Sequence, residues 1–444
     1  MLNYKFMTLV ALGASMASVA EAAKRPNVIV ILADDMGFAD AGFTGSKDIK
    51  TPNLDALAAD GVVFTNGYAN HPFSGPSRAA LMSGRYQYRF GFEANPGHDP
   101  NSMQGVPLSE TLFPERMQSV GYKTCAIGKW HLGGAPALHP CNRGFDFFYG
   151  FIGGSHDYFA SSISDPNDNG PKGVMMRNKK VETFEGYLTN VLTDNAVQFV
   201  EDNKDDPFFV YLAYNAPHAP LQAPKVNVAK YAHIKDWKRR TYAAMVDAMD
   251  IGVGRVVETL KKNGLYENTL IFFMSDNGGP TDNGSCNAPF RGHKGSLLEG
   301  GVHVPFMACW PAKFKAGATY DYPVNSIDIS RTAVAAAKGD IKKAPMMEGT
   351  DLVPYVTGKQ KGAPHEFIYW RAGNGVSRSA VSSTGEKYMI WGKNAPKLYN
   401  LTNDITEESD IASKSPQSIK AMGKAVEEWN KQNIDNKIVP MKHR

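Results

Sequence analysis

The chain has 444 residues, enough for one large enzyme domain with an appendage or for two or three smaller domains. Hydrophobic residues make up 43% and charged residues 21%, an ordinary globular composition that excludes a disordered or collagen-like chain. The 48 basic and 44 acidic residues leave a net charge of +4, which is too balanced at this length for nucleic acid to be the main partner.

The N-terminus has the pattern of a signal peptide. Lys5 supplies a short positive region, and residues 6 to 20 form an apolar stretch that is too short to span a bilayer. Small residues follow in a cleavage pattern that ends at Ala22, and no cysteine comes next that would accept a lipid. We expect residues 1–22 to be a signal peptide and the mature protein to be periplasmic or secreted, without a membrane anchor.

Apolar, β-branched runs then alternate with helical patterns as far as about residue 358. Such alternation predicts an α/β fold in which a mostly parallel sheet is buried on both faces. We assign residues 23–358 to this domain. The expected strands are residues 27–33, 123–127, 207–214, 269–275 and 302–310, and the expected helices are residues 52–60, 186–203, 237–263 and a further one after Asn325.

The pattern of predicted secondary structure changes after residue 359. Four short apolar runs separated by Gly and Asn turns predict strands at residues 367–370, 376–382, 387–391 and 397–401. A helical pattern follows at residues 416–432. We expect residues 359–444 to form a small C-terminal α+β subdomain with an antiparallel sheet and one helix.

The four cysteines are too few, in so long a chain, to form a disulfide scaffold. Cys125 and Cys309 lie in apolar stretches and are expected in the core. Cys141 and Cys286 lie in loop-like sequence, where an oxidising compartment would let them pair, and the sequence leaves this open. No Cys or His spacing suggests zinc.

Polar residues with oxygen ligands stand directly after two of the expected strands. Asp34-Asp35 follow the first strand, and Asp276-Asn277 follow the strand at residues 269–275. Carboxyl ends of parallel strands are where ligands bind, and such oxygens suit Ca²⁺ or Mg²⁺. The alternative is that these residues only form turns, since Asp and Asn favour turns after strands.

A loop that leads into a short helix at Ser74 offers a nucleophile. Ser74 would lie near the N-terminus of that helix, where backbone N–H groups favour an anion, and Arg78 would lie one turn further on. Further basic residues follow strands or glycines elsewhere, where they are more often structural than catalytic unless they gather at a site. These are Lys129, His131, His218 and Lys294.

The chain resembles the sulfatases that use a formylglycine nucleophile, in the alkaline-phosphatase-like superfamily. The family signature is matched by SGPSRAALMSG from Ser74 to Gly84, with Met82 and Ser83 as mild departures. Further matching blocks are RPNVIVILADDMG, TPNLDALAADGVVFTNGYA, IGKWHLG, APHAP, SDNGG, RGHKGSLLEGGVHVPF and KLYNLTND, so that the resemblance extends from about Arg25 to Asp404. It implies an α/β/α sandwich with a small C-terminal subdomain.

The resemblance also implies a metal and a modified residue. Ser74 would be oxidised after translation to 3-oxoalanine (formylglycine), and a serine at this position suggests an anaerobic-type sulfatase-maturating enzyme as a partner before export. One Ca²⁺ per chain would be held by Asp34, Asp35, Ser74, Asp276 and Asn277.

The same resemblance implies a role for each basic residue of the site. Arg78, Lys129 and Lys294 would bind the sulfate oxygens and offset their charge in the transition state. His218 would protonate the leaving oxygen as general acid. His131 would remove a proton from the hydrated aldehyde, so that sulfate leaves and the aldehyde forms again.

The substrate is expected to be a sulfated glycan, and our interpretation favours a carrageenan over glycosaminoglycans. Aromatic and Arg residues in the stretch 85–97 suit stacking on sugars and pairing with further sulfates, although they are equally suited to packing. The candidate substrate-binding residues are Arg85, Arg89, His156, Arg291, His293 and Arg371.

Two other functions are considered beside sulfate ester hydrolysis. One is a phosphate or phosphonate ester hydrolase of the same superfamily that uses unmodified Ser74. The other is a secreted protein that binds sulfated glycans without turning them over, which we would expect to have lost a catalytic position. None of the residues that the resemblance implies is missing.

Overall fold

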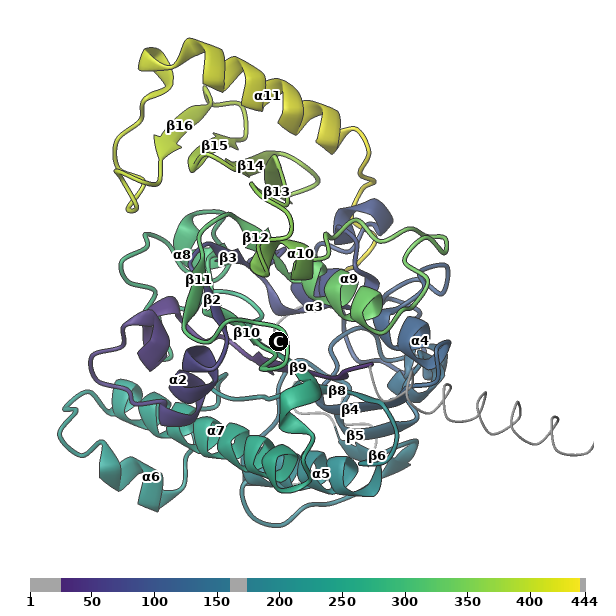
Figure 1. The fold of residues 1–444 in the computed structure, drawn as a ribbon. Helices are drawn as coiled ribbons and strands as arrows, with labels where there is room; N and C mark the ends of the chain where they lie inside the picture. Colours follow the sequence, from purple (N-terminus) through teal and green to yellow (C-terminus); the bar gives the residue numbers. More distant parts are fainter. Residues whose placement is uncertain (1–24, 160–173, 440–444) are drawn as a thin grey trace, which may run out of the picture.

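The computed structural model describes residues 25–159 and 174–439, so the predicted signal peptide at residues 1–22 lies outside the described residues. The described chain forms a large sheet with helices on both faces and a smaller sheet near its C-terminal end (Figure 1). The α/β fold class is therefore confirmed, as is the separate small antiparallel sheet. No helix in the described part of the chain has both the length and the apolar character needed to cross a membrane.

The large sheet has ten strands within the described residues. Their bounds are β1 (Asn27–Ala33), β2 (Val62–Phe64), β4 (Lys123–Lys129), β5 (Phe147–Phe151), β6 (Met175–Arg177), β7 (Lys180–Val181), β8 (Phe208–Ala213), β9 (Thr269–Ser275), β10 (Phe306–Cys309) and β11 (Ala318–Tyr320). They lie in the order β11-β2-β10-β9-β1-β8-β4-β5-β6-β7. The five neighbours β9, β1, β8, β4 and β5 are parallel, so the residues that follow them emerge at one edge of the sheet.

The helices cover the sheet on both faces (Figure 1). On one face lie α2 (Pro52–Ala59), α5 (Leu188–Asp202), α6 (Lys225–Lys230) and α7 (Trp237–Lys262). On the other lie α3 (Ser74–Ser83), α4 (Phe113–Gln118) and α9 (Ser326–Ala336), and the remaining short helices are α8 (Glu299–Val302) and α10 (Val353–Val356).

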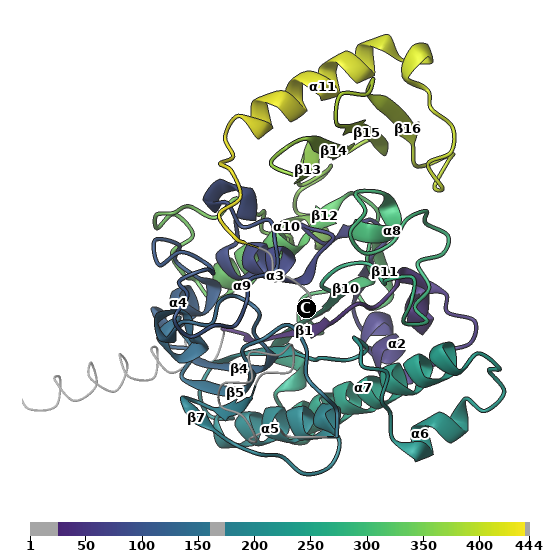
Figure 2. The same ribbon diagram turned by 180° about the vertical axis from the view of Figure 1, so that it is seen from behind.

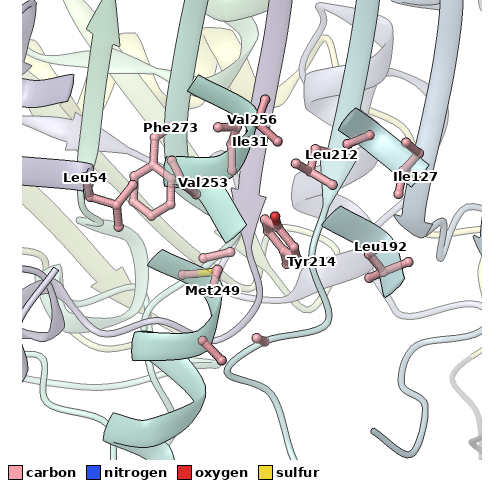
Figure 3. Close-up of a cluster of buried hydrophobic side chains, with 14 of the residues drawn as sticks. Ile31, Leu54, Ile127, Leu192, Leu212, Tyr214, Met249, Val253, Val256 and Phe273 are labelled. Atoms are coloured by element: carbon pink, nitrogen blue, oxygen red, sulfur yellow. The ribbon is translucent and has the colours of Figure 1, made fainter. Parts of the chain in front are cut away.

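Alternation along the strands builds a core on each face. Ile29 and Ile31 of β1 pack in the cluster between the sheet and α2, α5 and α7. Val28 and Val30 pack in the cluster on the other face, with α3, α4 and α9. Figure 3 shows the first cluster, in which side chains of β1, β8 and β9 meet those of α5 and α7. Strands buried on both faces explain why they are apolar throughout.

One predicted strand is wrong over half of its length. Residues 302–310 were expected to be extended, but the chain forms α8 up to Val302 and only Phe306–Cys309 joins the sheet. Pro305 lies between them and has no N–H group for a strand ladder. Gly301 lies so close to the Ser296 carbonyl oxygen that a Cβ there would be 2.0 Å away.

The C-terminal subdomain has a four-stranded antiparallel sheet, as predicted. It consists of β13 (Phe367–Ala372), β14 (Ser377–Ser382), β15 (Glu386–Trp391) and β16 (Lys397–Asn400), followed by α11 (Pro416–Asn430). Helix α11 covers the outer face of this sheet (Figure 2). The inner face packs through Trp370 and Met389 against Tyr68 and Val302 of the main domain.

The four cysteines are all free thiols. Cys125 and Cys309 are buried in β4 and β10, as expected for core residues. The pairing of Cys141 with Cys286, which the sequence left open, is not formed.

Candidate active site

The two polar pairs predicted to meet at the edge of the sheet do so. Asp34 and Asp35 follow β1, and Asp276 and Asn277 follow the adjacent β9. The Asp35 backbone N–H donates to Asp276 Oδ1 at 3.2 Å, and the Asn277 Nδ2 group donates to Asp35 Oδ1 at 2.7 Å. All four side chains are buried, so the cluster is a preformed site of carboxylate and amide oxygens.

Ser74 lies against this cluster as the first residue of α3. Its Oγ is 3.1 Å from Asp34 Oδ1 and 3.1 Å from Asn277 Oδ1. The helix that holds Ser74 is buried along its whole length and ends at Gly84, whose φ of 66° is the left-handed conformation that glycine adopts without strain. The hydroxyl is thus held beside two oxygen ligands by a rigid element.

Three basic side chains surround the carboxylates. The Arg78 guanidinium is fully buried and also donates to the hydroxyl of Tyr211. Each of the three forms one short ion pair with a carboxylate of the site: Arg78 Nη2 to Asp276 Oδ2 at 2.8 Å, Lys129 Nζ to Asp34 Oδ2 at 2.7 Å and Lys294 Nζ to Asp35 Oδ1 at 2.7 Å. Each of these three basic side chains is therefore paired with a buried carboxylate of opposite charge.

These pairs keep the carboxylates ionised. Burial raises the pKa of Asp34, but Lys129 and the neighbouring cations outweigh it, so the pKa lies below its ordinary value. Burial also raises the pKa of Asp35, but Lys294 and His218 outweigh this effect and lower the pKa below its ordinary value. The site thus presents two carboxylate anions at neutral pH.

The two histidines differ in surroundings. His131 is buried against Gly154, and neither of its ring nitrogens has a hydrogen-bond partner among the described residues. Burial, reinforced by Lys129, holds its pKa well below the ordinary value, which makes the ring a neutral base. His218 is partly exposed, and its Nε2 lies 3.5 Å from Asp35 Oδ2.

Two residues of the site have a left-handed backbone. Asp35 has a φ of 63° and His131 a φ of 60°, a conformation that residues other than glycine rarely adopt. Such strain persists where the surrounding structure imposes it, and it gathers at functional sites. It places both side chains at the turn that follows their strands.

The donor set fits a hard divalent cation. Asp34, Asp35 and Asp276 offer carboxylate oxygens and Asn277 an amide oxygen, which suit Ca²⁺ or Mg²⁺ and not zinc. One ligand atom each of Asp34, Asp35 and His218 lies within 4.8 Å of the others, as around a single ion.

The comparison with known families agrees with this geometry, because the family model described as Sulfatase matches residues 26–339. The chain belongs to the sulfatase family. It is therefore a sulfuric ester hydrolase.

Similar proteins include two curated sulfatases and one solved structure. The sulfatase YdeN of Escherichia coli is 35% identical over 78% of this chain and 68% of its own length. The N-acetylgalactosamine-6-sulfatase of Mus musculus is 33% identical over 84% and 73%. The structure of Ps i-CgsB in complex with k-i-k-neocarrahexaose is 39% identical, with a TM-score of 0.88 over 93% of this chain and 94% of that one.

Three of the candidate substrate-binding residues have other partners in this sulfatase. Arg85, Arg89 and Arg371 form ion pairs with glutamates of the protein itself, and Arg89 and Arg371 also contact the segment that follows α11. These contacts engage part of each guanidinium group, and the role of the three arginines as substrate ligands stays a prediction. The partners are Glu110 for Arg85, Glu348 for Arg89 and Glu93 for Arg371.

The other three candidates are placed differently. His293 and Arg291 are exposed and lie close to Lys294 in the sequence, and their role as substrate ligands stays a prediction. His293 Nδ1 is 2.8 Å from the Lys294 carbonyl oxygen, and Arg291 bonds to Tyr399. His156 is buried, with Phe151 and Phe184 against its ring.

An exposed aromatic ring lies beside the nucleophile and was not predicted from the sequence. Phe73 directly precedes Ser74 and is 38% exposed. Its ring lies over Gly295, where a Cβ would be 3.1 Å from the ring tip, and therefore next to Lys294. The apolar residue was indistinguishable in the sequence from core residues, since only the fold shows that the ring faces solvent.

Proposed function

We propose that this sulfatase hydrolyses sulfate esters on a carrageenan-type polysaccharide or oligosaccharide, with Ser74 oxidised to formylglycine and one calcium ion bound. The observation that carries the proposal is the position of the Ser74 hydroxyl, 3.1 Å from both Asp34 and Asn277 and beside three cations. The carrageenan hexasaccharide named with Ps i-CgsB supports the substrate class. The exposed Phe73 suits a sugar ring next to the reacting group.

The basic residues of the site have separate roles in catalysis. Arg78, Lys129 and Lys294 bind the sulfate oxygens and stabilise the charge that they carry in the transition state. His218, partly open to solvent, donates a proton to the leaving sugar oxygen. His131, neutral and without a partner among the described residues, accepts the proton whose loss releases sulfate.

The implied groups have a place among these residues. Asp34, Asp35, Asp276 and Asn277 would hold the calcium ion together with the residue at position 74. A calcium ion held by these residues would supply positive charge that stabilises the nucleophile and the reacting sulfate group. The formylglycine would supply a second hydroxyl, which serine lacks and which sulfate release requires.

The protein needs a partner enzyme before export and acts outside the cytoplasm. An anaerobic-type maturating enzyme would oxidise Ser74 before export, and the protein would act in the periplasm or outside the cell. The N-terminal pattern of residues 1–22 supports export.

The test compares Ser74→Ala with a serine variant at the other end of the same helix. The protein is co-produced with an anaerobic maturase and assayed for sulfate release from carrageenan oligosaccharides, chondroitin, heparan and an aryl sulfate. We expect the wild-type protein and Ser83→Ala to release sulfate from carrageenan, and Ser74→Ala to release none. The wild-type peptide that contains residue 74 should have the mass of the unmodified peptide minus two hydrogens. Turnover by Ser74→Ala would contradict the mechanism. Phosphate ester turnover without sulfate release would favour the phosphate or phosphonate ester hydrolase.

A further inference from the structure

The segment of residues 291–303 carries Lys294 into the site and is fastened to both loops around the nucleophile. Its Gly295 N–H donates to the Pro72 carbonyl at 2.9 Å, in the loop before Ser74. Its Lys294 N–H donates to the Gly279 carbonyl at 3.1 Å, in the loop after β9. The position of the Lys294 ammonium is thus set by how this segment lies.

Glu299 fixes the far end of the segment. Its carboxylate is buried and accepts a hydrogen bond from the Tyr68 hydroxyl at 2.9 Å, while His303 Nδ1 lies 2.8 Å away. The Lys387 ammonium forms an ion pair with the same carboxylate at 2.7 Å. The Glu299 backbone N–H donates to the Glu407 carboxylate at 2.8 Å.

Two of these partners come from the C-terminal subdomain. Lys387 lies on β15 and Glu407 follows β16, and their side chains are both fully buried. Lys387 Nζ is 2.9 Å from Glu407 Oε1, so the ammonium lies between two carboxylates. Buried ion pairs add little net stability over an apolar core, but each constrains the geometry of its partners.

We propose that Lys387 is a positioning residue for the sulfatase reaction, which holds Glu299 and thereby the segment that presents Lys294. The C-terminal subdomain then acts on the active site through Glu299, which Lys387 contacts at 2.7 Å. The inference rests on the proposed function, since Lys294 matters only if sulfate esters are turned over.

The test is a double-mutant cycle between Lys387→Met and Lys294→Ala, with kcat/KM measured on carrageenan oligosaccharides and on p-nitrophenyl sulfate. Lys387→Met alone should lower kcat/KM by about 10–100-fold, the usual effect of removing a residue that orients a reacting group. In the Lys294→Ala background the same change should cost less than about two-fold, because the residue that it positions is gone. Lys387→Arg should recover part of the loss.

His365→Gln is the matched control. His365 forms a buried ion pair with Asp328 across the same boundary between the two parts of the chain, far along the sequence from Lys294. It should lower the unfolding temperature and leave kcat/KM unchanged below that temperature. If Lys387→Met does not fold, the variant Lys387→Met/Glu407→Leu removes both charges and leaves Glu299 paired with His303.

Each outcome separates the two proposals. If the matured wild-type protein releases no sulfate, the proposed function fails. If the wild type is active and the loss from Lys387→Met is as large with Lys294→Ala as without it, the positioning role is overturned. A small effect of Lys387→Met on kcat/KM in a folded variant overturns it as well.

Discussion

At the scale of single residues, the site is a cluster of opposite charges that neutralise one another in a buried place. Lys129 and Lys294 each form an ion pair of 2.7 Å with one of the adjacent carboxylates Asp34 and Asp35. The same carboxylates are candidate metal ligands, so the ammonium groups and a cation share them. With a metal ion bound there, the ammonium groups would be placed to bind the oxygens of an anion next to it.

Calcium should stabilise the protein measurably. Removing metal with a chelator should lower the unfolding temperature and the rate of sulfate release, and added Ca²⁺ should restore both, because a ligand that binds only the folded state stabilises it. Asp35→Asn should lose most of the Ca²⁺-dependent shift in unfolding temperature. Asp250→Asn, a change at a buried aspartate of α7 outside the site, should keep it. An equal shift in both variants would argue against this metal site.

Phe73 should matter for sugar substrates and not for small ones. Phe73→Ala removes the exposed ring beside Ser74, so the KM for carrageenan oligosaccharides should rise about ten-fold, the equivalent of one aromatic contact of about 1.4 kcal/mol. The KM for p-nitrophenyl sulfate should change far less. Phe159→Ala, at another exposed phenylalanine, serves as the control for the loss of a surface ring. Equal effects on both substrates would exclude a sugar platform.

At the scale of the elements, parallel strands bring residues distant in sequence to one edge, and helix ends aim the rest. Asp328 shows how one helix end is secured. It accepts the Asn325 backbone N–H at 2.9 Å in the capping box of α9, and it pairs with His365 at 2.8 Å. Helix α9 packs on α3, so this cap stabilises the layer of helices on that face of the sheet.

The His365–Asp328 pair should make stability depend on pH. Burial lowers the pKa of His365, but the Asp328 carboxylate outweighs it and raises the pKa above 6.5. The stabilisation is therefore fully present below pH 6.5 and is lost as the pH rises through the folded-state pKa. His365→Gln should lower the free energy of unfolding by about 1.5–3 kcal/mol at pH 5.5 and by less at pH 8.5. Urea unfolding at several pH values checks this, and a difference independent of pH would contradict it.

At the scale of the whole molecule, the chain returns from the C-terminal subdomain to the main domain. After α11 the Ile434 N–H donates to the Tyr88 carbonyl at 3.1 Å and the Lys437 N–H to the Gly91 carbonyl at 2.7 Å. Ile438 is buried in the core of the main domain. Arg371 joins the two parts through Glu93 and the Ile434 carbonyl. The small sheet is thereby fastened on two sides.

Arg371→Met should therefore destabilise the protein. It leaves the buried Glu93 without its cation, a loss of about 3–5 kcal/mol in the free energy of unfolding. Arg378→Met is the control, because its partner Glu427 is half exposed and such a pair contributes about 0–1 kcal/mol. Denaturant unfolding measures both, and equal losses would show that burial of the pair is not the cause.

The sequence by itself determined the type of fold and the central residues of the site. Hydrophobic periodicity, bounded by turn-forming residues, predicted most strands and helices. Polar residues at strand ends indicated a site at Asp34, Asp35 and Asp276, because the carboxyl ends of parallel strands lie at one edge of the sheet. It did not show which of the candidate arginines pair within the protein itself. Arg89 and Arg371 have the chemistry of substrate ligands, but they pair with the protein's own glutamates.

Only the tertiary structure decided which charges meet and which rings face solvent. Phe73 is exposed and Lys387 is buried, the reverse of what their types suggest, because exposure depends on the packing of segments far apart in the chain. The contact between Lys387 and Glu299 joins β15 to the segment that bears Lys294 over a separation of 88 residues. No local pattern encodes such a pair, since it arises only when the small sheet packs on the main domain.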